Sequence, residues 1–86
     1  MKRYRFPHLR IVFKALPKDW GYTYPNEWAI YLDKRMDDKT MIDTASHEVI
    51  HKIIPDTKEE TVELCGQHIA DVLTRLGYRR IIKGDE

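Results

Sequence analysis

The segment ASHEVIH, residues 45–51, contains two of the four histidines of this 86-residue chain, with a glutamate directly after the first. On a helix, His47 and His51 project from the same face one turn apart, so they can bind one metal ion. Glu48 lies about 100° further round the helix, too far to be a natural third ligand but within reach of a water on the same ion. The pattern H-E-x-x-H is typical of a zinc hydrolase in which the glutamate is the general base.

A catalytic zinc ion needs a third protein ligand and an open coordination position. Pro55 turns the chain just after His51, which brings the first turn of the next helix near the last turn of this one. Three glutamates are candidates. The helical wheel places Glu59 nearest the inner apolar side and turns Glu60 mostly away, while Glu63 lies between them and could hydrogen-bond a histidine. We expect Glu59 to be the ligand, in a position where the helix N-terminus also favours a carboxylate.

The same residues have a simpler explanation, which is a helix that carries histidines without a metal. A shuffled chain of this composition contains H-E-x-x-H about once in a hundred, and acidic residues are common in the first turn of any helix. His68 is expected to be a surface residue, His8 a loop residue without a functional role, and Cys65 a small core residue. The metal prediction therefore depends on context: a helix, a histidine face away from the main apolar stripe, and a carboxylate from a second helix.

The first half of the chain has the composition and alternation of strands. Apolar and polar residues alternate over residues 9–14 and again over residues 27–32, and residues 21–24 are rich in β-formers. Pro25-Asn26 is a turn signal between the last two segments, which are close enough to form a hairpin.

The second half has a helical period. A helix over residues 38–54 would begin at Asp37 or Asp38 and end before Pro55, with an apolar stripe of Ile42, Ala45, Val49 and Ile53. A second helix would be capped by Asp56 or Thr57 and run to about residue 76, with Gly77 ending it. Gly66 inside this helix suggests close packing, for example on the first helix. Its expected inner face comprises Val62, Cys65, Ile69, Val72, Leu73 and Leu76.

Composition excludes several classes of function. The net charge is +1, from 15 basic and 14 acidic residues, which gives no electrostatic reason to expect nucleic-acid or membrane binding. No apolar segment is long enough to span a bilayer, and the basic N-terminus lacks the apolar region of a signal peptide. The single cysteine, Cys65, excludes an internal disulfide framework. We therefore expect a cytoplasmic protein.

His47-Glu48-Val49-Ile50-His51, followed by a carboxylate on the next helix, resembles the gluzincin zinc metallopeptidases. It is most similar to their very small versions, the minigluzincins, and to short HExxH proteins encoded by phages and prophages. The resemblance covers about residues 9–77. It implies His47 and His51 as zinc ligands, Glu48 as general base and a glutamate of the second helix as third ligand. It also implies that the last strand, residues 27–32, borders the cleft and pairs with an extended peptide substrate.

The chain departs from the family in three respects. The spacing from His51 to Glu59 is short compared with larger gluzincins, and no second subdomain forms the far wall of a cleft. The residue that would stabilise the oxyanion is not identified, and the candidates are Tyr31, Tyr78 and Arg35. Small members of the family can be latent, and here the charged tail, residues 78–86, could cover the site.

These observations predict one minimal zincin-like domain over residues 1–86 with an α+β fold. A small, three-stranded antiparallel sheet would be followed by an active-site helix and a glutamate-bearing helix. The predicted function is zinc-dependent hydrolysis of peptide bonds, by His47, His51, Glu59 and Glu48, with a peptide or protein as substrate.

Two other functions are considered. A non-catalytic, zinc-stabilised protein-interaction domain would usually use four protein ligands, often thiolates, and Cys65 is poorly placed for that. A helix-turn-helix nucleic-acid binder is disfavoured by the charge balance and by the acidic start of the second helix.

Overall fold

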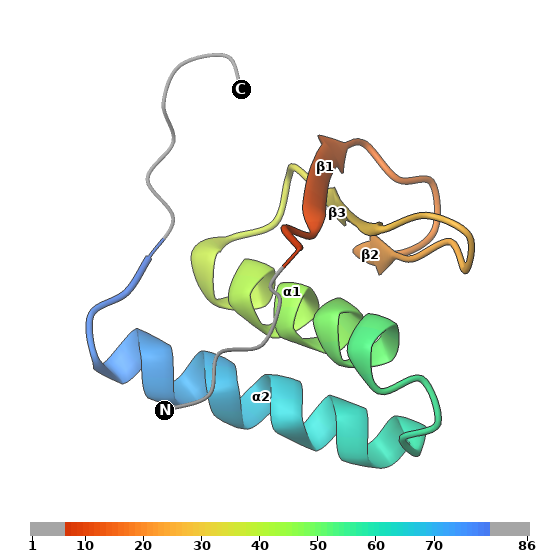
Figure 1. Cartoon of the computed structure of the whole chain (residues 1–86). Helices are drawn as coiled ribbons and strands as arrows, with labels where there is room; N and C mark the ends of the chain where they lie inside the picture. The colour runs from red at the N-terminus through yellow and green to blue at the C-terminus, as the bar shows by residue number, and fades with distance from the viewer. Residues whose placement is uncertain (1–6, 80–86) are drawn as a thin grey trace.

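The computed structural model describes residues 7–79, which form a three-stranded sheet followed by two helices (Figure 1). The strands are β1 (Arg10–Lys14), β2 (Gly21–Tyr22) and β3 (Ala29–Asp33), and the helices are α1 (Asp38–Ile53) and α2 (Glu59–Arg75). α1 is the middle layer, because it packs on the sheet with one side and on α2 with the other. The predicted α+β fold, a small sheet followed by two helices, is confirmed.

The sheet is mixed, which corrects the prediction of a wholly antiparallel one. β2 and β3 form the expected antiparallel pair, with Tyr22 opposite Tyr31. β1 runs parallel to β3 on its other edge, with Ile11 opposite Ile30. In the strand order β1-β3-β2, residues 15–20 connect β1 to β2, which is not its neighbour. β3 then lies between these two strands.

β3 is therefore the central strand, with a neighbouring strand on each edge, which corrects the expectation from the family resemblance that an extended peptide pairs with it. Its residues are buried except for Tyr31, which is half-buried. The strand edge that lies against α1 belongs to β2. A Cβ atom at Gly21 would lie 2.6 Å from Thr44 Cγ2 and 2.9 Å from Glu48 Cγ, so the absence of a side chain at Gly21 lets β2 come this close to α1.

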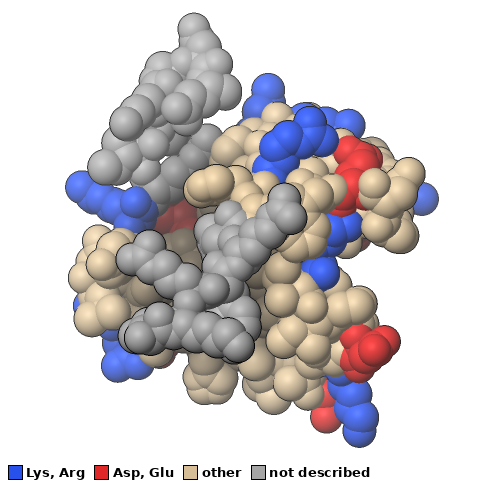
Figure 2. Space-filling view, in the orientation of Figure 1, with Lys and Arg blue, Asp and Glu red and all other residues tan. Residues whose placement is uncertain are grey.

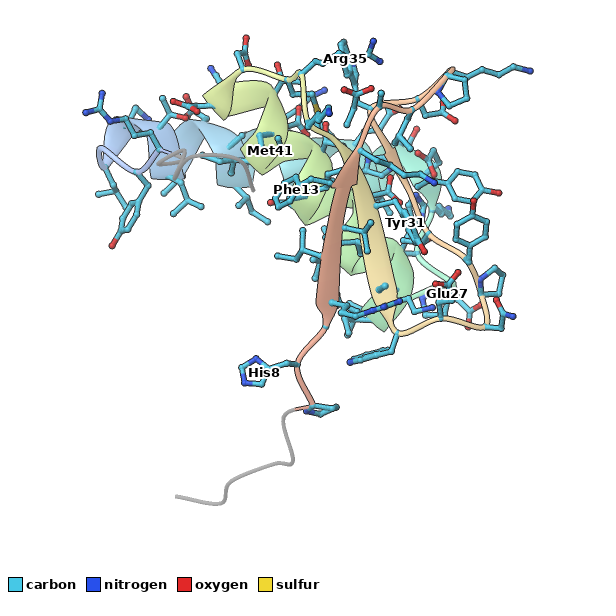
Figure 3. The ribbon with its side chains drawn as sticks, turned by 90° about the horizontal axis from the view of Figure 1, so that it is seen from above. His8, Phe13, Glu27, Tyr31, Arg35 and Met41 are labelled. Carbon is cyan, nitrogen blue, oxygen red and sulfur yellow. The ribbon has the colours of Figure 1, made fainter. Side chains whose placement is uncertain are left out.

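The core lies between the sheet and α1. Its buried members are Ile30, Leu32, Met36 and Met41, and Leu9, Phe13 and Ala45 pack against them. Phe13 and Met41 lie on the helix side of the sheet, whereas Tyr31 lies on the opposite side (Figure 3). This small core holds α1 in a fixed position under the sheet.

α1 begins and ends close to the predicted residues. Asp37 is the N-cap and accepts a hydrogen bond from the Thr40 N–H at 2.8 Å. The helix ends at Ile53, just before the Ile54–Pro55 bond. The predicted apolar stripe is only partly buried, because Val49 and Ile53 are exposed. The three strands are short and cover the N-terminal part of that stripe, but not its C-terminal part.

α2 begins one residue later than a cap at Thr57 would allow. Its N-cap is Lys58, which makes no side-chain capping bond, so the prediction of Asp56 or Thr57 as the cap was wrong. The helix ends at the predicted place, with Gly77 at a φ of 91°. The Tyr78 N–H donates to the Leu73 carbonyl at 3.0 Å and closes the last turn.

The inner face of α2 was predicted incorrectly. Val62 is buried as expected, but Cys65, Ile69, Val72 and Leu76 are exposed. The other buried residues of α2 are Gly66 and Ala70, which have small side chains or none. α2 therefore approaches α1 closely along a line of small residues, while Ile69 and Leu73 border an open apolar groove that α1 also lines. No helix within residues 7–79 combines the length and apolar composition needed to cross a membrane.

Candidate metal centre

The structure brings together the three residues that the sequence suggested as metal ligands. The Nε2 atoms of His47 and His51, one turn apart on α1, lie 2.9 Å from each other. Glu59, the first residue of α2, places Oε1 3.0 Å from His47 Nε2 and Oε2 3.1 Å from His51 Nε2. Of the three candidate glutamates, Glu59 is the one in this cluster.

The donor atoms lie at separations close to those of a tetrahedral zinc site. In such a site, with bonds of about 2.0–2.1 Å, ligand atoms are separated by about 3.3 Å. Here the two Nε2 atoms are 2.9 Å apart, and each lies 3.0 or 3.1 Å from a different carboxylate oxygen of Glu59. Two imidazoles with one carboxylate form a donor set that zinc accepts. Within the described part of the chain, this is the one group of three or more such residues with ligand atoms close together. The residues present therefore fit a zinc ion.

The cluster is open on one side. The His47 and His51 side chains are 20% and 28% exposed, and that of Glu59 is 60% exposed. Cys65 is also exposed and is not part of the cluster. Three protein ligands with an accessible side are typical of catalytic zinc sites, whereas structural sites usually have four protein ligands.

Two features of the helix pair bring Glu59 to the histidines. The connection is tight: the Ile54 N–H donates to the Ile50 carbonyl at 2.8 Å, and the Thr57 N–H donates to the Ile54 carbonyl at 3.1 Å. The second feature is Gly66, where an added Cβ would lie 3.0 Å from the Asp43 backbone oxygen. The helices can therefore approach closely near the histidines, which sets the reach of the Glu59 carboxylate.

Glu48 occupies a different position from the three ligands. It is 8% exposed and lies between α1 and β2, beneath Gly21. Burial raises the pKa of its carboxyl group, while the neighbouring His47 and His51 lower that pKa. The side chain is therefore next to the cluster without being part of it, as the helical geometry of HExxH predicted.

A groove of about 480 Å³ lies beside Glu48 and His47. β2 and the residues before it form one wall, and α1 and α2 form the other. Its lining was not identified from the sequence, because it depends on the way that β2 packs on α1. The lining residues are Asp19, Trp20, Gly21, Thr40, Asp43, Thr44, His47, Glu48, Glu63 and Gln67.

The three candidates for oxyanion stabilisation are elsewhere. Tyr31 donates a hydrogen bond to Glu27 at 2.8 Å on the face of the sheet away from α1 (Figure 3). Arg35 is paired with Asp33. Tyr78 follows the C-terminal end of α2, whereas Glu59 is at its N-terminal end. The structure brings none of the three to the cluster, and the tail predicted to cover the site lies, from residue 80 onward, outside the described residues.

His68 is exposed, as expected. His8 is also exposed, and neither histidine is part of the cluster. Comparison with known proteins gives no further assignment: no protein-family model, no curated protein and no solved structure matches the chain.

Proposed function

We propose that this protein is a zinc-dependent peptide hydrolase. The observation that carries the proposal is the triangle of His47, His51 and Glu59, with the buried Glu48 beside it at an open groove. A zinc ion held there would lower the pKa of a bound water towards 7 and polarise the carbonyl of the scissile bond. Two of the three proposed ligands, His47 and His51, are on the same helix as Glu48, so α1 positions them relative to one another, and α2 contributes Glu59.

The protein residues have distinct roles in this proposal. His47, His51 and Glu59 hold the ion and leave one side of it accessible. Glu48 takes a proton from the attacking water and delivers it to the leaving amine. A carboxyl group with a raised pKa suits this role, because it must bind and release a proton in one turnover near neutral pH.

The substrate would lie along β2, and not along β3 as expected from the family resemblance. The Asp33 N–H donates to the Trp20 carbonyl at 2.7 Å, so the next residue, Gly21, directs its N–H and C=O away from β3. Gly21 also lines the groove beside Glu48. An extended peptide could therefore add to this strand edge, with backbone hydrogen bonds giving affinity.

The decisive experiment is the Glu48→Gln substitution in zinc-loaded protein. Hydrolysis would be sought with a diverse peptide mixture and mass spectrometry, and the rate then measured on one cleaved peptide. We expect Glu48→Gln to lower kcat/KM by about 10²–10⁴-fold, while about one zinc per chain remains bound. Equal rates in the two proteins, with zinc bound in both, would refute the assigned role of Glu48 and with it the proposed mechanism.

One observation favours a second candidate, a zinc-stabilised protein-interaction domain without catalysis. Large apolar side chains are exposed over α2 and its neighbours, among them Ile69, Val72 and Leu76. Exposed apolar surface of this kind often marks protein contacts. Zinc binding without hydrolysis of any peptide in the mixture would favour this candidate. The single cysteine supports a cytoplasmic location for either function.

The helix-turn-helix alternative receives no support from the surface. On the face shown in Figure 2, basic and acidic side chains are scattered among neutral ones and do not gather in a single basic patch.

A further inference from the structure

The groove beside Glu48 has an unbalanced charge. Three carboxylates line it in addition to Glu48: Asp19 precedes β2, Asp43 is on α1 and Glu63 is on α2. The lining contains no lysine or arginine. Because these carboxylates come from three different parts of the chain, the fold concentrates negative charge that is dispersed in the sequence.

The groove carboxylates are also unpaired, whereas several acidic residues elsewhere in the described chain have a basic partner. Glu27 is paired with Arg10, and Asp71 with Arg75. Within residues 7–79, none of Asp19, Asp43 and Glu63 is in an ion pair. Their charge is therefore available to a ligand.

Glu48 opens onto the same groove. Its side chain is nine-tenths buried and lines the groove, and it has no hydrogen-bond partner within residues 7–79. No side-chain oxygen of the described residues is both sealed from solvent and unpaired, so the Glu48 carboxylate is open to the groove. A ligand in the groove can therefore reach this carboxylate.

The shape of the groove suits a long cationic side chain better than a second metal ion. Among the described residues, the one cluster tight enough for an ion is that of His47, His51 and Glu59, so the groove carboxylates are too dispersed to form another. Trp20, which is 52% exposed, forms part of the wall. An indole ring can pack against the alkyl part of a lysine or arginine and attract its charged end.

From these observations we propose that the groove is a specificity site for a lysine or arginine side chain of the peptide substrate, next to the scissile bond. This inference rests on the proposed function, because it assigns a substrate class to the same site. The polypeptide would lie along β2 at Gly21, and the basic side chain would extend between Asp19 on one wall and Asp43 and Glu63 on the other.

The test is a binding measurement that does not require turnover. Fluorescent peptides would carry a ketomethylene group in place of the scissile amide, so that they cannot be cleaved. At each residue flanking that group, lysine would be compared with norleucine, which is uncharged, and with glutamate. Fluorescence anisotropy with zinc-loaded protein would give each Kd.

We expect the lysine peptide to bind about tenfold more tightly than the norleucine peptide at one of these positions, and the glutamate peptide more weakly than both. The preference should decrease as salt is raised, because the groove is open to solvent. In an Asp43→Asn/Glu63→Gln double variant that retains zinc, the ratio of the norleucine Kd to the lysine Kd should fall to about twofold or less. The control is Glu60→Gln, which removes a charge from the same helix outside the groove and should leave the preference unchanged.

Three outcomes would overturn the inference. They are equal affinity for lysine and norleucine peptides, no binding of the lysine peptide at millimolar concentration, and an equal loss of preference in Glu60→Gln. The double variant could also lose zinc while the fraction that keeps zinc still prefers lysine. That result would assign the carboxylates to metal binding and would also overturn the inference. The proposed function fails separately: a lysine preference without cleavage of the corresponding amide would refute hydrolysis alone, and cleavage without the preference would refute the specificity site alone.

Discussion

Two clusters of charged residues lie at different places around the sheet, and they differ in how completely they are satisfied. Asp33, at the end of β3, is fully buried, and its carboxylate accepts hydrogen bonds from the Leu16 N–H and from the backbone and guanidinium of Arg35. Arg35 in turn donates to the Leu16 carbonyl. Both oxygens of the Asp33 carboxylate are used within the fold, so the cluster joins the start of the β1–β2 connection to the end of β3.

The metal cluster is incomplete by comparison. His47, His51 and Glu59 direct their ligand atoms at one another from two helices, and the nearby Glu48 is buried without a hydrogen-bond partner within residues 7–79. The comparison shows how a structural charge cluster can be distinguished from a candidate site in a single structure. The Asp33 cluster is closed by its own partners, whereas the candidate site leaves the Glu48 carboxylate without a partner among residues 7–79.

The largest expected effect on the metal cluster is that of removing its third ligand. Glu59→Ala should weaken zinc binding by about 100-fold or more, since even the loss of outer partners of metal ligands costs 10–100-fold. Glu60→Ala, which changes the neighbouring exposed glutamate, should leave the affinity within about twofold. Competition with a chromogenic chelator would measure both. Equal affinities of the two variants would remove Glu59 from the site.

A smaller effect should follow from separating the two helices. At Gly66→Ala, the new Cβ would lie 2.6 Å from Asp43 Oδ1 and 3.0 Å from the Asp43 backbone oxygen, so α2 must shift away from α1. We expect a loss of about 1–3 kcal/mol in the free energy of unfolding. The shift should also weaken zinc binding by about tenfold, because Glu59 is on α2. Urea unfolding and chelator competition would measure the two effects, and unchanged zinc affinity would show that close helix packing does not position Glu59.

A substitution in the Asp33 cluster should lower the stability of the fold and leave zinc affinity nearly unchanged. Asp33→Ala removes the acceptor of the Leu16 N–H and of Arg35, and should lower the Tm by about 5–10 °C. Zinc affinity should change little, because neither residue contacts the metal cluster. Calorimetry of the zinc-free protein and chelator competition would give these two values. A variant with unchanged Tm and lost zinc would reverse the roles assigned to the two clusters.

The smallest effect is a dependence of stability on acid. Hydrogen bonds from Arg35 hold the pKa of the Asp33 carboxyl well below its usual range, and hydrogen bonds from Thr40 lower that of Asp37. Because both pKa values are lower in the folded state than in the unfolded chain, their stabilisation is complete above about pH 4 and decreases as the pH falls below it. Urea unfolding of zinc-free protein between pH 5 and about 2.5 should show this decrease, and Asp33→Asn should make it shallower. An identical slope in the variant would contradict the assignment.

The sequence alone predicted the metal cluster better than the fold around it. His47, Glu48 and His51 lie on one helix, so their relative positions follow from helical geometry. The short turn at Pro55 limited the third ligand to the start of the next helix, and the helical wheel favoured Glu59 among the three glutamates there. Local geometry was therefore sufficient to bring all four residues to one place.

The errors concern interactions between segments distant in the sequence. The parallel pairing of β1 with β3 has no local signal, and because of it the proposed substrate edge is on β2 and not on β3. α2 buries Gly66 and Ala70 while Ile69 and Val72 are exposed, because close approach to α1 requires small residues and hydrophobicity alone does not indicate that. The pairing of Asp33 with Arg35 and Leu16 depends on where the β1–β2 connection passes, so Arg35 could be taken for a catalytic residue.

The central claim is that His47, His51 and Glu59 hold a zinc ion. The most direct test is elemental analysis of protein incubated with zinc and then freed of unbound metal, in the wild type and in His47→Ala, with His68→Ala as a control for a histidine outside the cluster. We predict about one zinc per chain in the wild type and in His68→Ala, and little or none in His47→Ala. A wild-type protein without zinc, or equal zinc in the wild type and His47→Ala, would contradict the claim.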